Sequence, residues 1–339
     1  MNRYWRKIYT GLILLGLVFA GCAPRATPAA SGQFPIKVCY SALTATQVPV
    51  LYAYDKGLFA NHGLAVELIY IESGTTAATA MIAGEVAICQ VAGSSVVSAA
   101  VVGEDLVFVG GLFNTYVYSL LVDPEVLTPE DLRGKAVAVS RIGSSSDAAM
   151  RAALTHFGLQ PDKDVAILEI GDQDARIAAM ASHQIAGTVA SIPASAIAKE
   201  QGFRVLLDMS TLNIPYQHTA VATTRSYIAS NRAQVVAFMQ ALTDALGLIR
   251  SDREGTKAVI AKYLQLDPVQ DAGLLSDTYD ELIPEYLPEV PYPTLEGIQL
   301  LLDQLEPQNP QAASFTASQL VDLSILGEIG FKPPTPVAP

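Results

Sequence analysis

The sequence predicts an α/β protein with two lobes, built on mainly parallel sheets that are flanked by helices. Three observations carry this prediction. The chain has 339 residues, which is long for one compact core. Half of the residues are hydrophobic and only 16% are charged, so the chain can bury large cores. Short β-branched runs alternate with helical patterns from Ile36 to Thr224, and a helical region follows them.

The N-terminal segment has the features of an export signal followed by a lipid-attachment motif. Residues 1–21 have a cationic start and an apolar run of about ten residues, which is too short to span a bilayer. Ala20, Gly21 and Cys22 resemble the bacterial lipobox, in which the cysteine is lipid-modified, although Phe19 stands where leucine is usual. An ordinary signal peptide is the alternative. Residues 22–34 are rich in small residues and predict a flexible tether.

Ten apolar runs predict the strands of the body. Several are apolar almost throughout, as expected for parallel strands that are covered on both faces. The predicted strands are Ile36–Tyr40, Val66–Ile71, Val86–Val91, Leu106–Val109, Tyr118–Val122, Ala136–Val139, Val165–Ile170, Thr188–Ala190, Val205–Asp208 and Val221–Thr224.

Helical patterns lie between these strands and dominate after Thr224. Val235, Phe238 and Leu242 belong to an apolar stripe with helical spacing. The predicted helices are Thr75–Ala83, Asp147–Phe157, Asp174–Ser182, Asn231–Arg250, Thr256–Leu264, Val269–Leu282 and Thr294–Leu305. The proline-rich residues 332–339 predict a flexible tail.

Cys39 and Cys89 both fall within apolar strand-like runs. We predict that they are buried, unpaired small hydrophobic residues. The alternative is a disulfide, formed in an oxidising compartment. Such a bond would have to cross neighbouring strands, where disulfide geometry is usually poor.

Composition and motifs exclude several classes of function. The net charge of −12, without a basic stripe, argues against a nucleic-acid partner. The sequence contains no GxSxG, HExxH, P-loop, CxxC or GxGxxG motif, so we expect neither an enzyme nor a cofactor. The four histidines lack metal-ligand spacing, and we expect no metal site. Of these, His218 lies near the hinge and the cleft that a two-lobed protein is expected to have.

Two groups of motifs carry a resemblance to a known family. The first group is DKGLF at 55–59, HGLAVEL at 62–68 and AGEVA at 83–87, and the second is DLRGKAVAV at 131–139 with GLQP at 158–161 and DV at 164–165. In order and spacing these blocks resemble the solute-binding proteins of the nitrate, sulfonate, taurine and thiamine-pyrimidine uptake group. The resemblance covers most of Ile36–Phe331. We expect these residues to build the fold and not to contact ligand.

The resemblance implies the bilobal type II periplasmic-binding-protein fold with a helical C-terminal extension. Lobe one would comprise 34–117 and 219–331, and lobe two would comprise 118–218. It also implies the substrate-binding component of an ABC importer, which delivers a solute to separate permease and ATPase chains. With the lipid anchor at Cys22, we expect a monomer on the extracytoplasmic face of the cell membrane.

The loops that follow predicted strands supply the candidate ligand contacts, because open α/β sheets bind ligands at the carboxyl ends of their strands. Their Ser, Thr, Gly, Asn and Tyr residues offer adaptable hydrogen bonds and stacking faces. The candidate binding residues are Ser41, Thr44, Gln47, Ser73, Gly74, Ser94, Asn114, Tyr116, Gly143, Ser144, Ser145, Ser191 and Tyr216.

The segment Gly143–Asp147 precedes a predicted helix, whose free N–H groups could hold an anion or a carbonyl oxygen. Alternatively, Ser146 or Asp147 merely caps this helix. Cations near the candidate loops are few, namely Arg141 and Arg176. Because Arg176 falls within a helical run, we predict that it is a solvated surface charge.

Tyrosines near these loops and the scarcity of cations favour a heteroaromatic nutrient, riboflavin first and a thiamine pyrimidine second. The alternative is a sulfonate, taurine or nitrate ligand. A pyrimidine synthase of the same fold is a remote alternative, since the chain lacks the cysteine-rich motif of those enzymes. A ligand-sensing partner of a signalling receptor is a further one.

Overall fold

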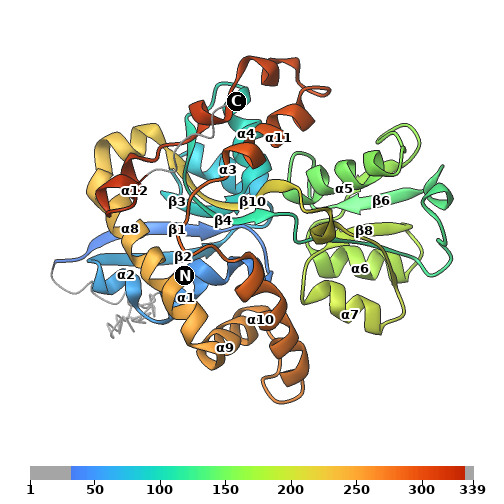
Figure 1. Ribbon diagram of the computed structural model, residues 1–339, viewed down its shortest axis with the longest axis horizontal. Coiled ribbons are helices and arrows are strands. Elements are labelled where there is room, and N and C mark those ends of the chain that lie inside the picture. Colours follow the sequence, from blue (N-terminus) through green and yellow to red (C-terminus); the bar gives the residue numbers. More distant parts are fainter. Residues whose placement is uncertain (1–31, 333–339) are drawn as a thin grey trace, which may run out of the picture.

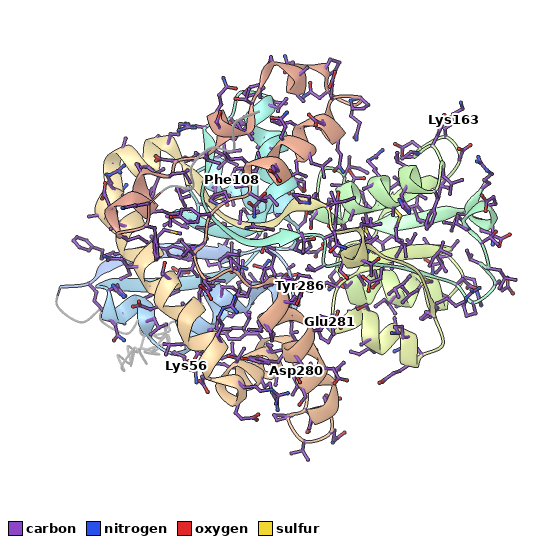
Figure 2. The ribbon with its side chains drawn as sticks, viewed as in Figure 1. Lys56, Phe108, Lys163, Asp280, Glu281 and Tyr286 are labelled. Atoms are coloured by element: carbon purple, nitrogen blue, oxygen red, sulfur yellow. A yellow bond between two sulfur atoms is a disulfide. The ribbon has the colours of Figure 1, made fainter. Side chains whose placement is uncertain are left out.

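The computed structural model describes residues 32–332, and the predicted signal, Cys22, most of the tether and the tail beyond residue 332 lie outside them. The described chain forms two lobes side by side (Figure 1). Each lobe is a five-stranded sheet with helices on both faces, so the predicted α/β class is confirmed. In Figure 2, Phe108 lies within the larger lobe and Lys163 at the far end of the smaller one.

The larger lobe holds the first sheet, with strand order β2-β1-β3-β10-β4. Its middle strand, Ile88–Ala92, is buried at every residue, as its apolar sequence predicts. The strands are β1 (Phe34–Tyr40), β2 (Leu64–Tyr70), β3 (Ile88–Ala92), β4 (Leu106–Thr115) and β10 (Pro215–Thr224), and the accompanying helices are η1 (Ala45–Gln47), α1 (Val48–Asp55), α2 (Leu58–Asn61), α3 (Gly74–Ile82) and α4 (Gly93–Val101).

The smaller lobe holds the second sheet, with strand order β7-β6-β8-β5-β9. It is the green region of Figure 1, in which α5, α6 and α7 surround the sheet. Its elements are β5 (Ser119–Val122), η2 (Pro129–Leu132), β6 (Ala136–Val139), α5 (Ser145–His156), β7 (Ala166–Glu169), α6 (Gln173–Ala181), β8 (Gly187–Ala190), α7 (Ala194–Glu200), β9 (Arg204–Asp208) and η3 (Met209–Leu212).

The C-terminal helices complete the larger lobe. The long helix α8 packs on α1 and α2, where the rings of Phe59 and Phe238 stack with centroids 4.9 Å apart. Helix α11 covers β10 and α4. The helical elements after β10 are α8 (Arg225–Ser251), α9 (Arg253–Leu264), α10 (Ala272–Tyr286), α11 (Leu295–Leu305), η4 (Pro310–Ser314), η5 (Ala317–Leu320) and α12 (Ser324–Glu328).

Both sheets are mixed but mainly parallel, as predicted, because in each of them four strands run in one direction and the fifth runs antiparallel to them. In the first sheet β10 runs antiparallel to β3 and β4, and in the second β5 runs antiparallel to β8 and β9. Each of these two strands is the first that the chain forms after it crosses from one lobe to the other. Such a strand enters its sheet from the cleft side, so its direction is opposite to that of its neighbours.

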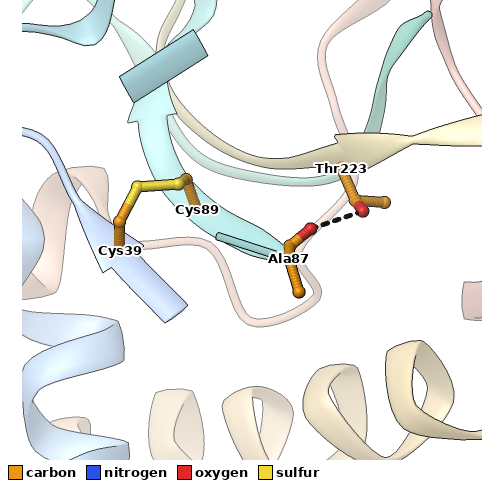
Figure 3. Close-up of a disulfide and its surroundings, with 4 residues drawn as sticks. All are labelled: Cys39, Ala87, Cys89 and Thr223. Carbon is orange, nitrogen blue, oxygen red and sulfur yellow. Dashed lines mark hydrogen bonds between the residues drawn. A yellow bond between two sulfur atoms is a disulfide. The ribbon is translucent and has the colours of Figure 1, made fainter. Parts of the chain in front are cut away.

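Cys39 and Cys89 form a disulfide, which corrects the prediction of two unpaired cysteines (Figure 3). The register of the parallel pair β1 and β3 places the two residues directly opposite each other, with Cα atoms 4.4 Å apart. Both are fully buried. Near the start of β3, the Thr223 hydroxyl donates a hydrogen bond to the Ala87 carbonyl at 2.7 Å, which ties β10 to the same part of the sheet.

Candidate functional site

A polar cleft lies between the two lobes, at the carboxyl ends of several strands. Loops after β1 and β2 form the wall in the larger lobe, and loops after β6 and β7 form the opposite wall. The enclosed volume is about 70 Å³, which is room for roughly five water molecules. In this arrangement of the lobes the cleft therefore suits a small ligand.

Helix starts surround the cleft. Helices α3, α4, α5 and α6 each have nine or more residues, and residues at or just before their first turns line it. The N–H groups of a first helical turn have no partner within the helix, and they carry the positive end of the helix dipole. Four such ends around one small volume favour a ligand with negatively charged oxygens.

The wall from the smaller lobe is a network of serines before α5. The Ser144 hydroxyl caps the helix by accepting a hydrogen bond from the Asp147 N–H at 3.4 Å. It also lies 2.9 Å from the hydroxyls of both Ser140 and Ser146. The Ser145 hydroxyl lies 2.8 Å from that of Tyr118. These hydroxyls can rotate to donate to a ligand, so capping and ligand binding are compatible here.

Arg176 is buried beside this network and lines the cleft, with only 2% of its surface exposed, which corrects its prediction as a solvated charge. Its guanidinium donates to the Thr188 hydroxyl at 2.8 Å and to the carbonyls of Val189 and Gly171. It forms no ion pair within the described chain. Burial lowers its pKa, but a guanidinium stays charged at neutral pH.

Unpaired polar atoms gather on the cleft. Six buried side-chain polar atoms of residues 32–332 have no hydrogen-bond partner, and four of them belong to residues of this lining. They are Gln47 Oε1, Gln173 Nε2, His218 Nδ1 and Thr219 Oγ1. A buried polar group without a partner costs about 1–3 kcal/mol. A polar ligand in the cleft would remove that cost.

His218 forms part of the floor of the cleft. Burial lowers its pKa to about 3, so the ring is neutral at physiological pH. Its ring packs edge-on against Tyr118, with centroids 4.7 Å apart. A neutral imidazole offers one donor and one acceptor, so His218 can hydrogen-bond a ligand without adding charge.

Seven of the thirteen candidate residues line this cleft: Ser41, Thr44, Gln47, Ser73, Gly74, Ser144 and Ser145. Six do not. The Asn114 amide donates to the Tyr292 carbonyl and accepts from Gln217. Ser191 is buried behind the wall, where its N–H donates to Gln173 Oε1. Ser94, Tyr116 and Gly143 line a different hollow, and Tyr216 lines neither.

Tyr116 and Tyr216 stack on each other and not on a ligand. Their ring centroids are 3.8 Å apart with an interplanar angle of 13°, and both side chains are almost completely buried. Tyr116 lies in the first crossing between the lobes, and Tyr216 lies at the start of β10, just after the second. The pair therefore joins the two crossings at the hinge. This removes two of the expected stacking rings from the cleft, whereas Tyr70 and Tyr118 are part of its lining.

The hollow beside the hinge has a different character from the cleft. It is larger, about 520 Å³, and is lined mainly by apolar side chains of Leu212, Leu300, Leu301 and Leu305. Two of its charged residues, Arg151 and Asp147, are paired with each other, and Arg151 also bonds to Asp162. The contacts of Ser94 and Ser95 with the Gly143 carbonyl, both at 3.4 Å, lie near the boundary between the two spaces.

Several residues that line the cleft are not among the thirteen candidate binding residues. They include Glu72, Tyr118, Asp172, Gln173, Asp174 and Arg176. The sequence does contain a pattern from which the burial of Arg176 could have been predicted. Gln173, Arg176 and Met180 are spaced three and four residues apart, so they share one face of a helix with an apolar residue. That pattern predicts a face turned inward.

The comparisons with known proteins agree with this architecture. An alkanesulfonate-binding protein, SsuA, from Xanthomonas axonopodis pv. citri bound to MOPS aligns with 88% of this chain and 99% of its own, with TM-score 0.70 and 21% identity. The periplasmic aliphatic sulphonate binding protein SsuA of Escherichia coli aligns with 88% and 92%, with TM-score 0.66 and 21% identity. The periplasmic nitrate-binding protein NrtA of Synechocystis PCC 6803 aligns with 87% and 88%, with TM-score 0.72 and 12% identity.

These structural neighbours confirm the predicted bilobal binding-protein fold. A search of curated proteins gave no significant match. Across residues 32–332 no helix is long and apolar enough to cross a membrane, and no group of three or more His, Cys, Asp or Glu side chains is placed to hold a metal ion. A family model described as NMT1/THI5 like matches residues 45–254, more than half of the sequence. The chain therefore belongs to the NMT1/THI5-like family.

Proposed function

We propose that this protein is the solute-binding component of an ABC importer and works on the extracytoplasmic side of the membrane. The family and the two-lobed fold with an interlobe cleft support this role. The Cys39–Cys89 disulfide supports an oxidising compartment outside the cytoplasm. Closure of the lobes on a solute would create the surface that a permease recognises, and the solute would leave chemically unchanged.

The solute is a small molecule that carries an oxyanion. The observation that carries this proposal is the buried guanidinium of Arg176 on the cleft wall, without an ion-pair partner in the described chain. Burying an unpaired charge is costly, and an anionic ligand is the natural compensation. The serine hydroxyls before α5 and the starts of four helices would add hydrogen bonds to the same group.

The two heteroaromatic candidates, riboflavin and a thiamine pyrimidine, have less support. The preference for them rested partly on ring stacking by Tyr116 and Tyr216, which instead stack on each other, although Tyr70 and Tyr118 do line the cleft. It also rested on a lack of cations, whereas Arg176 is buried at the cleft. Riboflavin is large and uncharged in its ring system, whereas the small cleft and the buried charge of Arg176 favour a small alkanesulfonate or nitrate.

Thermal-shift assays followed by calorimetry would test this proposal on the purified protein. The panel comprises alkanesulfonates, aminosulfonates, nitrate, riboflavin and the thiamine pyrimidine. At least one small oxyanion should bind with a micromolar or lower Kd, and about 100 times that concentration should add roughly 2.7 kcal/mol to the free energy of unfolding. Binding of riboflavin, with none of any oxyanion, would refute the proposal.

The membrane anchor is a separate part of the proposal. Cys22 is the expected lipid attachment site and lies outside the described residues. Cys22→Ser should leave the protein unprocessed or released from the membrane, as measured by detergent partitioning and intact mass. A variant that still carries acyl chains would show that the anchor is elsewhere.

A further inference from the structure

The hollow beside the hinge is a second space between the lobes. Helix α5 of the smaller lobe contributes Ala148 and Ala152 to its lining, and helix α11 of the larger lobe contributes Leu300 and Leu305. All four side chains are only partly buried, although the opposite faces of both helices pack in the core. Two helices therefore present apolar faces to each other across a space that keeps them apart.

A hydrogen-bonded cluster fixes both crossing segments to the larger lobe. Gln217 Nε2 donates to Asn114 Oδ1 at 2.9 Å, which joins the second crossing to the first. Gln217 Oε1 accepts from the Thr294 N–H at 2.8 Å, and Asn114 Nδ2 donates to the Tyr292 carbonyl at 3.1 Å. A Cβ atom on Gly93 would clash with the Gln217 carbonyl oxygen, so helix α4 packs directly on this cluster. This end of each crossing therefore moves with the larger lobe.

The residues that can bend lie between this cluster and the smaller lobe. In the first crossing they are residues 116–118, which belong to neither β4 nor β5. In the second crossing they are residues 213–214, between η3 and β10, where Asn213 has a φ of 51°. Hinges between rigid bodies are usually a few such residues at the ends of elements. A line through the two segments is thus the axis about which the smaller lobe can turn.

The cleft and the hollow lie on opposite sides of this axis. Helix α11 contacts α5 beside the hollow, whereas α10 contacts η1, whose residues line the cleft. In Figure 1 the segments that cross between the lobes run between α11 and α10. Helix α5 reaches both spaces, because Ser145 in its first turn lines the cleft and Ala152, two turns later, lines the hollow. A rotation that opens the cleft therefore moves the middle of α5 towards α11.

The loop before α5 rests on the larger lobe at the boundary between the two spaces. The Gly143 carbonyl accepts hydrogen bonds from the hydroxyls of Ser94 and Ser95, both at 3.4 Å. Gly143 has a φ of 78°, and a Cβ atom on it would meet the Thr75 methyl group at 3.4 Å. This close approach makes Gly143 the point on which α5 can pivot.

We propose that the hollow is the space into which α5 moves when the cleft opens, and that its apolar lining stabilises the open state. In the open protein Ala148 and Ala152 lie against Leu300 and Leu305, which removes their apolar surface from water. In the closed protein the same surface is exposed in the hollow. The lining therefore opposes closure without a solute, so that the empty protein differs in shape from the loaded one. This inference goes beyond the proposed function and concerns the ligand-free protein, whatever the solute is.

Distances between two spin labels in the ligand-free protein test this inference. Unnatural amino acids carry the labels at positions 199 on α7 and 277 on α10, which are exposed and belong to different lobes. The hollow of about 520 Å³ has room for an indole ring in the closed arrangement. Ala152→Trp should block the movement of α5, so the long-distance population of the open protein should be lost. Leu300→Ser should shift the ratio of open to closed protein about fivefold towards closed, because it removes part of the apolar contact.

Two variants are the matched controls. Leu295→Ser changes another leucine of α11, and Val102→Trp adds the same ring to a site that is 61% exposed; neither position lines the hollow. Both should keep the distances of the unsubstituted protein, and circular dichroism verifies that each variant is folded.

Three results would overturn the inference. They are a ligand-free protein without an open population, an open population that survives Ala152→Trp, and a shift towards the open form in Leu300→Ser. Each of them would leave the proposed function in place, because solute binding is not part of the measurement. Loss of the open population in Ala152→Trp, with both controls unchanged, supports the inference.

Discussion

The two lobes share one sheet plan but contribute different chemistry to the cleft. The orders β2-β1-β3-β10-β4 and β7-β6-β8-β5-β9 match strand for strand, with the antiparallel strand in the fourth position of each. The larger lobe has the disulfide, the C-terminal helices and a mostly neutral polar wall. The smaller lobe contributes Arg176, the serine network and two acids, Asp172 and Asp174.

This difference indicates that the two lobes have different roles. A shared plan brings the loops after corresponding strands to the same cleft, and the side chains on those loops then decide what is bound. The larger lobe is cross-linked by the disulfide, and the smaller lobe carries most of the charged residues that line the cleft. Substitutions in the larger lobe should therefore change the free energy of unfolding, and substitutions in the smaller lobe should change the affinity for the ligand.

The largest expected effect is on the stability of the larger lobe. Replacing both Cys39 and Cys89 with alanine removes a cross-link between residues 50 positions apart, which should lower the free energy of unfolding by about 2–5 kcal/mol. Urea unfolding measures this loss. Ligand affinity should change less than threefold, because neither cysteine lines the cleft. A loss of affinity with unchanged stability would contradict the division between the lobes.

Arg176 should give the largest effect on affinity. Arg176→Gln removes charge-assisted hydrogen bonds, which contribute about 1.5–3 kcal/mol each, so Kd should rise by about 100-fold. Arg176→Lys keeps the charge but loses the planar fork and should be intermediate. Calorimetry, with circular dichroism to verify folding, measures both.

Arg141→Gln is the matched control for Arg176. The Arg141 side chain is 51% exposed, its nearest acid is Glu169 at 3.9 Å, and it does not line the cleft. Its substitution should leave Kd unchanged within about twofold. An equal loss of affinity from both variants would mean that long-range charge, and not contact with the cleft, attracts the ligand.

His218 should make stability depend on pH. Its pKa is about 3 in the folded protein, against 6.5 for the unperturbed group. Between these values the unfolded chain binds the extra proton, so stability rises with pH and is lost as the pH falls from 6.5 towards 3. The slope from this group is roughly 1.4 kcal/mol per pH unit. Urea midpoints at pH 7 and pH 5 should differ less in His218→Gln. An identical difference in both proteins would refute the assignment to His218.

The hinge tyrosines should give the smallest effects, and unequal ones. The Tyr116 hydroxyl accepts a hydrogen bond from Gln304 Nε2 at 2.9 Å, whereas the Tyr216 hydroxyl has no partner at hydrogen-bond distance within residues 32–332. Tyr116→Phe should therefore cost about 0.5–1.5 kcal/mol, and Tyr216→Phe should be neutral or slightly stabilising. Thermal unfolding compares the two. If Tyr216→Phe lowers stability more than Tyr116→Phe does, the Tyr216 hydroxyl makes a hydrogen bond in the folded protein.

Most of the fold could be predicted from the sequence, because its strands are short, apolar and β-branched. Each of the ten predicted strands overlaps an observed one, and Ala136–Val139 coincides with β6. Strand direction could not be predicted, since β5 and β10 contain apolar runs like those of the other strands in their sheets, although they run antiparallel to their neighbours. The disulfide was missed because it depends on the register of β1 against β3, which apolar periodicity does not specify.

The site was predicted in part, for a similar reason. The rule that ligands bind after strands found Ser41, Thr44, Ser73 and Ser144, because these residues lie in the loops that follow strand ends. It could not find Arg176, which lies inside a helix. It also could not show that Tyr116 lies at the hinge and not in the cleft. That distinction depends on how two crossing segments pack, which is a long-range property.

A crystal structure of the protein with its tightest-binding small oxyanion tests the central claim most directly. The account predicts that the oxyanion lies in the cleft between the lobes, within hydrogen-bond distance of the Arg176 guanidinium and of the first N–H groups of α5. Ligand density in the apolar hollow beside Leu300 and Leu305, or in the cleft but away from Arg176, would contradict it.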